Sequence, residues 1–107
     1  MNYTREEKQG CALVRIEGPF TIYEAPALRE LFLECFEKYR GLILDLESVT
    51  ECDTAGIQIL CSARATAEAG GKILLADRMS DAVVNALTAG GLTSEKVSRP
   101  EEGGTAK

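Results

Sequence analysis

The hydrophobic spacing changes abruptly between residues 28 and 46. Apolar side chains first recur at intervals of three and four, the pattern of one helical face: Leu28, Leu31, Phe32, Cys35, Phe36 and Tyr39. After Gly41, where the helix is expected to end, the stretch GLILDL is almost wholly apolar, as expected of a short strand covered on both faces. A helix that runs directly into a buried strand indicates an α/β fold.

The same alternation continues towards the C-terminus. Residues 54–69 predict a second helix stopped by a glycine pair, and the KILLAD segment after it predicts a strand. Ser80 is placed to cap a third helix, which a second glycine pair stops. We expect three of its side chains to face inward: Val83, Val84 and Leu87. A short strand is predicted near residues 95–98.

Two further strands are predicted near the N-terminus. Residues 2–8 read as a polar edge strand that ends at Gln9-Gly10, and residues 11–16, CALVRI, as a strand that Gly18-Pro19 breaks. The chain of 107 residues fits one domain. Together the segments predict an α/β domain with one small, partly parallel sheet.

Composition excludes several classes of partner. The net charge of −5 and the scattering of the 12 Lys and Arg residues argue against nucleic-acid binding, which needs a basic patch. No apolar run approaches the roughly 20 residues of a membrane span, so we expect no membrane insertion. The N-terminal MNYTREEKQG lacks the apolar stretch of a secretory signal, which makes the cytoplasm the expected location.

The absence of histidine from the sequence excludes Ser-His-Asp, Cys-His and histidine-based metal sites. The cysteines Cys11, Cys35, Cys52 and Cys61 form no C-x-x-C pair and fall within apolar patterns, so we expect reduced thiols. A cysteine enzyme using Cys61 would lack both a histidine and a resolving cysteine. We therefore expect no metal, no cofactor and no catalytic activity.

The junction ECDTAGIQIL, residues 51–60, combines a helix start with polar side chains. Backbone N–H groups are unpaired at a helix N-terminus, and Asp53 is expected to cap them, contributing on the order of 1 kcal/mol. Gly56 costs up to ~1 kcal/mol against alanine in a helix, which close packing against a strand would explain. Thr54 is not needed as a cap, so its hydroxyl is expected to point outward.

The helix after this junction carries apolar side chains outside its core stripe. The expected inward face comprises Ile59, Leu60, Ala63 and Ala67. Ile57 and Cys61 fall on a separate flank beside Thr54. Either the helix is enclosed between the sheet and a neighbouring helix, or this flank is a docking surface. A phosphate on Thr54 would add ~1.5–2 negative charges at pH 7 where a partner would touch.

The order of the segments GPFTIY, LILDL, DTAGIQIL and GGKIL resembles that of STAS domains. The resemblance runs from about Cys11 to Leu92, and the relatives are bacterial anti-sigma factor antagonists and single-domain STAS proteins. It implies the α/β STAS fold, a small mixed sheet of about four to five strands flanked by about three to four helices. We expect the domain to span residues 1–98, followed by a disordered polar tail, residues 99–107.

The resemblance also implies a non-catalytic role in partner switching. In antagonist members, a Ser or Thr directly after the Asp is phosphorylated by a kinase that is itself the anti-sigma factor, and phosphorylation breaks the complex. Carried over to this sequence, the acceptor is Thr54, and the partner is a kinase-type anti-sigma factor or another ATPase. The implied partner-binding residues are Thr21, Tyr23, Asp53, Thr54, Ala55, Gly56, Ile57, Gln58 and Cys61.

Two positions depart from the antagonist pattern. Ala55 follows the acceptor where a Ser or Thr is usual, and Thr21 stands where an acidic residue is frequent. The motifs DTAG and TIY are more similar to two other STAS groups, which serve chemotaxis signalling complexes and phospholipid-transporting ABC systems. A constitutive adaptor that docks without phosphorylation is therefore the alternative.

Overall fold

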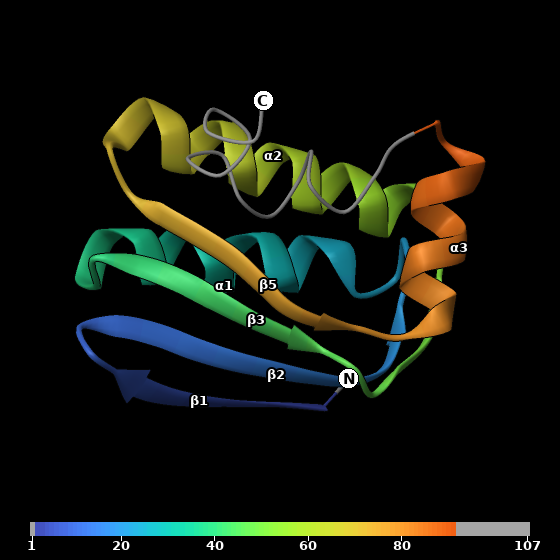
Figure 1. Cartoon of the computed structure of the whole chain (residues 1–107), viewed down its shortest axis with the longest axis horizontal. Helices are drawn as coiled ribbons and strands as arrows, with labels where there is room; N and C mark the ends of the chain where they lie inside the picture. Colours follow the sequence, from blue (N-terminus) through green and yellow to red (C-terminus); the bar gives the residue numbers. More distant parts are fainter. Residues whose placement is uncertain (1, 92–107) are drawn as a thin grey trace.

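The computed structural model describes residues 2–91, which form three helices and a five-stranded mixed sheet (Figure 1). The resemblance to STAS domains predicted this fold class, and it is confirmed. The predicted strand near residues 95–98 and the tail lie outside the described residues. In chain order the elements are β1 (Asn2–Lys8), β2 (Cys11–Phe20), α1 (Ala25–Lys38), β3 (Gly41–Leu46), β4 (Val49–Cys52), α2 (Thr54–Gly70), β5 (Ile73–Met79) and α3 (Asp81–Ala89).

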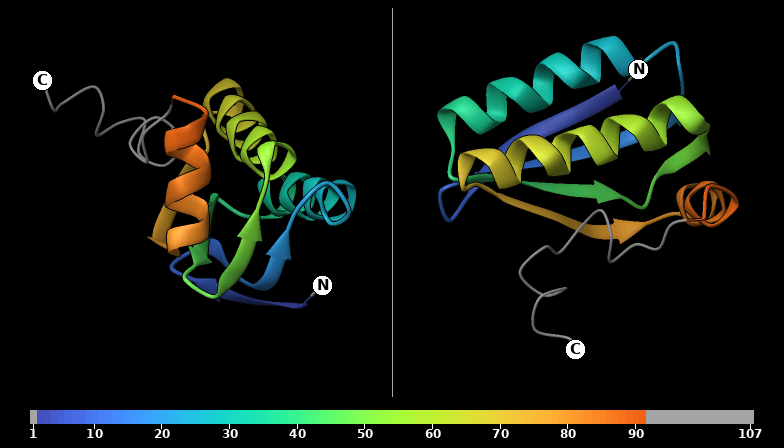
Figure 2. Two further views of the ribbon diagram at one scale, coloured as in Figure 1. Left: turned by 90° about the vertical axis from the view of Figure 1, so that its right-hand side faces the viewer. Right: turned by 90° about the horizontal axis from the view of Figure 1, so that it is seen from above.

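The sheet runs in the order β1-β2-β3-β5, with β4 paired to β2 off this path. Among the strand pairs of residues 2–91, only β1–β2 is antiparallel. The two strands are joined by a turn at Gln9-Gly10, where the first strand was predicted to end. Both turn residues have positive φ, as is typical of a two-residue hairpin turn. Helices α1 and α2 lie side by side over one face, and α3 lies at the end where β4 and β5 finish (Figure 2).

Strand β2 does not break at Gly18-Pro19, so that prediction is wrong. The strand runs through both residues, and its register shifts between them. Residues Ala12 to Arg15 pair with β3, whereas Gly18, Pro19 and Phe20 pair with β4, so the shift lies within the pairing with β4. Gly18 has φ +85°, which glycine adopts without strain, and Pro19 has no N–H to leave unpaired at the bulge. The Gly-Pro pair therefore belongs to the part of β2 that pairs with β4, just after the strand has changed neighbour.

Strand β4 was not predicted. Its four residues, VTEC, are too few to show a period, and Thr50 and Glu51 are exposed. The sequence therefore suggested that the buried strand leads directly into the second helix. Instead, a turn after Leu46 leads into β4, and β4 places Asp53 next to the C-terminal end of β2.

The core lies between the sheet and the two helices. The predicted apolar face of α1 is confirmed, because its residues from Leu28 to Phe36 at that spacing are buried. Ser80 caps α3 as predicted, with its side chain accepting from the Val83 N–H at 3.3 Å. Val83 and Leu87 are buried, whereas Val84 is 42% exposed and does not face inward. No helix in residues 2–91 has the length and apolarity to cross a membrane.

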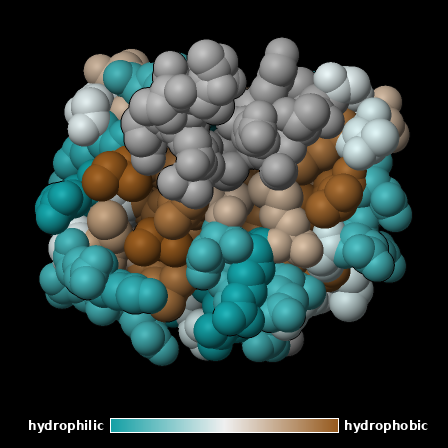
Figure 3. Space-filling view, viewed as in Figure 1, coloured by the Kyte–Doolittle hydropathy of each residue, from teal (hydrophilic) through white to brown (hydrophobic). Residues whose placement is uncertain are grey.

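The opposite sheet face carries a cross-strand row of partly buried apolar side chains: Leu13, Ile43 and Leu75. Figure 3 shows this side, with apolar surface beside hydrophilic borders. Next to the row, the buried Asp45 accepts from Arg15 Nε at 3.0 Å and from the Glu47 N–H at 3.1 Å. Burial alone would raise the pKa of the Asp45 carboxyl, but these two donors outweigh it and hold the pKa below its ordinary value.

Candidate functional site

Asp53 lies between β4 and α2 and contacts two separate segments. Its Oδ1 accepts from the Gly56 N–H at 3.0 Å, which caps α2 as predicted. Its Oδ2 accepts from the Ile22 N–H at 3.1 Å, in the loop between β2 and α1. The cap follows from the sequence, whereas the bond to the loop depends on β4 lying beside the end of β2.

Gly56 lies where α2 crosses the end of β2. A Cβ atom on this residue would lie 2.5 Å from the Phe20 carbonyl oxygen and 3.1 Å from Cys52 Sγ. Real Cβ atoms do not approach a backbone oxygen that closely, so only glycine allows this helix position. Close packing against a strand, as expected from the sequence, explains the residue.

Thr54 is the first residue of α2, and its side chain is exposed. Among the side-chain hydrogen bonds found in residues 2–91, none involves the Thr54 hydroxyl, since Asp53 supplies the cap. Thr54 is thus exposed and not needed as a cap, in agreement with the sequence. Of the neighbouring residues on α2, Gln58 is exposed, and Ala55 and Cys61 are partly buried.

The loop between β2 and α1, which is bonded to Asp53, presents two large apolar side chains. Ile22 is 61% exposed and Tyr23 is 88% exposed, more than any other large apolar residue in the described part of the chain. The Thr21 N–H and hydroxyl both donate to Glu24 Oε1, at 2.9 and 2.7 Å. These bonds lower the pKa of the Glu24 carboxyl and hold the loop in one shape.

Sequence reasoning named Thr21 and Tyr23 but missed Ile22. The T-x-x-E spacing of Thr21 and Glu24 has the sequence form of a capping box and is a signal for an ordered helix entry, although in the structure Glu24 itself is the N-cap of α1. The exposed residues Ile22, Tyr23, Thr54 and Gln58, with the partly exposed Ala55, are hereafter called the Thr54 surface.

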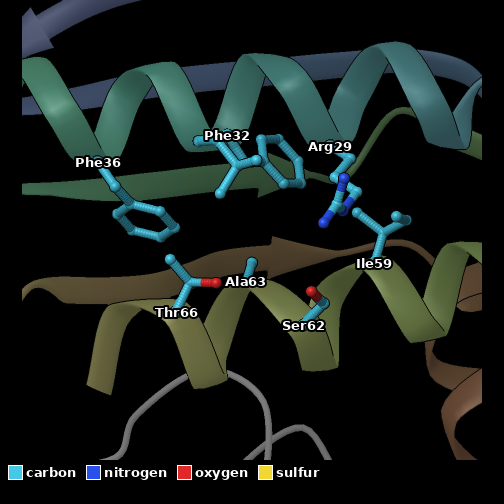
Figure 4. Close-up of a pocket in the computed structure, with 8 residues that line it drawn as sticks. Arg29, Phe32, Phe36, Ile59, Ser62, Ala63 and Thr66 are labelled. Carbon is cyan, nitrogen blue, oxygen red and sulfur yellow. The ribbon is translucent and has the colours of Figure 1, made fainter. Parts of the chain in front are cut away.

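Ile57 does not belong to this surface. It is only 6% exposed and is part of the core, so at Ile57 this flank of α2 is enclosed and is not a docking surface. Of the two arrangements that the sequence left open, the enclosed helix is the one observed here, because α3 packs against α2 and β4 on this side of α2. Ile59, expected to face inward, is partly buried and faces α1 instead (Figure 4).

A groove of about 270 Å³ lies between the start of α2 and the C-terminal half of α3. Its lining residues are Cys52, Asp53, Thr54, Ile57, Ala86, Ala89 and Gly90. Small side chains on α3 leave this space open, and sequence reasoning did not point to them. The groove is somewhat smaller than the ~300–1,000 Å³ of typical small-molecule sites.

The second hollow lies between α1 and α2, where Phe32 and Phe36 face Ala63 and Thr66 (Figure 4). It holds only about 10 Å³, close to the minimum of ~10–15 Å³ that a single water needs. This hollow is a packing defect between two helices rather than a ligand site.

The Cys52 thiol lies next to the site and is not activated. Burial, assisted by the neighbouring Asp53 carboxylate, raises the pKa of the Cys52 thiol to about 11. All four cysteines are free, with Cys11 and Cys35 buried. Within the described residues, no three His, Cys, Asp or Glu side chains are grouped so that they could hold a metal ion.

Comparison with protein families identifies the class of this domain. The family described as "Mlab, STAS domain" matches residues 3–98. The chain therefore belongs to the STAS domain family, as its sequence motifs suggested. No curated protein matches it at a significant level.

Several solved structures are similar in fold, among them the following three. A sulfate transporter family protein from Wolinella succinogenes is 27% identical, with a TM-score of 0.65, over 83% of this chain and 76% of that one. The unphosphorylated anti-sigma factor antagonist SpoIIAA is 13% identical, with a TM-score of 0.58, over 67% and 68% of the two chains. Mglu is 15% identical, with a TM-score of 0.58 over 73% of this chain; the match spans only 19% of the Mglu chain.

Proposed function

We propose that this protein is a non-catalytic regulator of the anti-sigma factor antagonist kind, which binds a protein partner through the Thr54 surface. The partner is a kinase-type anti-sigma factor or a related ATPase, and Thr54 is its phosphorylation site. In that reaction the γ-phosphoryl group of ATP passes to Thr54 Oγ1, the hydroxyl proton is released, and ADP leaves.

One observation carries the proposal: an exposed threonine, whose hydroxyl makes none of the side-chain hydrogen bonds found in residues 2–91, follows Asp53, and Asp53 is bonded to the loop that carries two exposed apolar side chains. Membership of the STAS family and the fold shared with SpoIIAA support the choice of partner class. Tyrosine is enriched among the residues that dominate protein interfaces, which makes Tyr23 the natural anchor.

The phosphorylation test uses the full chain, ATP and the kinase-type anti-sigma factor of the same organism. We expect intact-mass spectrometry to show one added phosphoryl group, which Thr54→Ala abolishes. Thr50→Ala is the matched control, because Thr50 is also exposed and lies four positions earlier in the sequence. Modification of the Thr54→Ala protein would contradict the assignment.

The binding test must avoid Ile57, because a polar substitution there would disrupt the core. Tyr23→Ala should weaken partner binding more than tenfold, as truncation of an interface anchor does. Tyr3→Ala is the matched control, a partly exposed tyrosine on β1. Isothermal titration calorimetry with the purified kinase gives both affinities. Equal affinities would remove Tyr23 from the interface, and tight binding without phosphate transfer would indicate the constitutive adaptor instead.

A further inference from the structure

The Asp53 carboxylate joins two segments that lie 31 residues apart in the sequence. Oδ1 holds the first turn of α2 through Gly56, and Oδ2 holds the loop through Ile22. Hydrogen bonds to an ionised acceptor are about twice as strong as neutral ones. One side chain thus fixes the exposed Ile22–Tyr23 pair relative to Thr54.

The other hydrogen bonds of the loop do not reach α2. The Thr21 N–H and hydroxyl both donate to the Glu24 carboxylate, and the Tyr23 N–H donates to the Thr21 hydroxyl at 3.4 Å. All three bonds therefore lie within the loop and the start of α1. Loss of the Asp53–Ile22 bond would therefore free the loop from α2 while its internal bonds remain.

We propose that Asp53 couples the phosphorylation state of Thr54 to the position of the Ile22–Tyr23 pair, an inference that rests on the proposed function. A phosphate on Thr54 carries ~1.5–2 negative charges at pH 7 and lies one residue from the Asp53 carboxylate. Its oxygens also compete for the N–H groups at the start of α2, where anions are stabilised.

The two bonds of Asp53 are not equally able to resist this competition. The bond to Gly56 lies at the positive end of α2, which stabilises a carboxylate there. The bond to Ile22 lies between exposed groups and has no such support. Repulsion by the phosphate therefore breaks the Ile22 bond first. Phosphorylation then acts twice, because it adds charge and also releases the apolar pair from its docking position.

An Asp53→Asn variant separates the cap from the contact with the loop. Asparagine caps helices about as well as aspartate, so the Gly56 bond is kept. Its second polar group is an NH₂ donor, which meets the Ile22 N–H as donor against donor. The variant is thus a helix-capped protein with a free loop.

The experiment is residue-resolved amide hydrogen exchange by NMR on the full chain, comparing the wild type with Asp53→Asn, Thr54→Glu and Thr54→Val. Thr54→Glu places a carboxylate near the phosphate position, and Thr54→Val is its neutral, similarly shaped control. We expect the Ile22 amide to exchange roughly ten- to a hundredfold faster in Asp53→Asn and Thr54→Glu, since it loses a charge-assisted bond. The Thr21 amide, held by Glu24, should not change in any variant.

An unchanged Ile22 exchange rate in Asp53→Asn would overturn the proposal, because the bond would then not hold the loop. Faster exchange in Asp53→Asn but not in Thr54→Glu would also overturn it, since the loop would not respond to charge at residue 54. If Thr54→Glu frees the loop and yet no kinase modifies Thr54, the coupling stands and the proposed function fails.

Discussion

Replacing Gly56 by alanine tests whether the start of α2 is held against β2 by direct backbone contact. The new Cβ would lie 2.5 Å from the Phe20 carbonyl oxygen and 3.1 Å from Cys52 Sγ. A flexible side chain could move out of the way, but a carbonyl inside a paired strand cannot. The first turn of α2 must therefore shift away from β2, and Thr54 shifts with it.

Two opposing effects set the magnitude. Alanine in place of glycine inside a helix gains up to ~1 kcal/mol. Overpacking costs typically about 1–3 kcal/mol, and a clash with backbone puts Gly56→Ala at the upper end. The expected net loss is roughly 1–2 kcal/mol in the free energy of unfolding, which lowers the Tm by roughly 4–16 °C for a domain of this size.

The matched control is Gly70→Ala in the last turn of the same helix. A Cβ there would meet only Lys72 Cγ, at an ordinary contact distance of 3.6 Å. We therefore expect Gly70→Ala to be neutral or to stabilise by up to ~1 kcal/mol. Urea denaturation followed by circular dichroism measures both variants. A Gly56→Ala protein as stable as the wild type, or more stable, would refute close packing as the reason for this glycine.

Two further predictions concern titratable groups. With a pKa of about 11, only roughly a thousandth of the Cys52 thiol is ionised at pH 8. An alkylating reagent should therefore label Cys52 far more slowly in the native protein than in guanidinium, with labelling measured by peptide mass spectrometry. Equal rates in the two conditions would contradict the raised pKa. Because the pKa of Asp45 is lowered in the fold, its ionised carboxylate stabilises the protein at pH values above the ordinary aspartate pKa of ~3.9. This stabilisation is lost as the pH falls below that value. The difference in free energy of unfolding between the wild type and Asp45→Asn, measured by urea denaturation, should therefore shrink from pH 7 to pH 3. A constant difference would contradict the lowered pKa of Asp45.

The features that could be predicted from the sequence are those set by residues near one another in the chain. The amphipathic face of α1 and the caps at Asp53 and Ser80 depend on spacings of three or four residues, and they are confirmed. The family motifs likewise identified Thr54 as a site candidate, and its role remains a prediction.

The features that could not be predicted depend on which segments meet in space. For Ile57 the sequence left an enclosed and an exposed position open, and a helical wheel could not decide between them because it does not contain α3. Ile22 matters because β4 brings Asp53 to its N–H, and the four-residue β4 has too few residues to show a pattern. The strand-breaking signal of Gly18-Pro19 was misread because the sequence does not show that β2 changes neighbours there.

That change of neighbours also affects when the Thr54 surface can exist during folding. The last residues of β2, Gly18 to Phe20, pair in parallel with β4, and the Ile22–Asp53 bond likewise joins distant residues, 31 positions apart. Contacts at such separation form only after the entropy of closing the intervening chain has been lost, and α1 and β3 lie within that loop. A chain with α1 folded but β4 unpaired has no Thr54 surface, so the proposed partner would bind only molecules that have completed the sheet. Partner binding would then be a direct measure of the folded fraction.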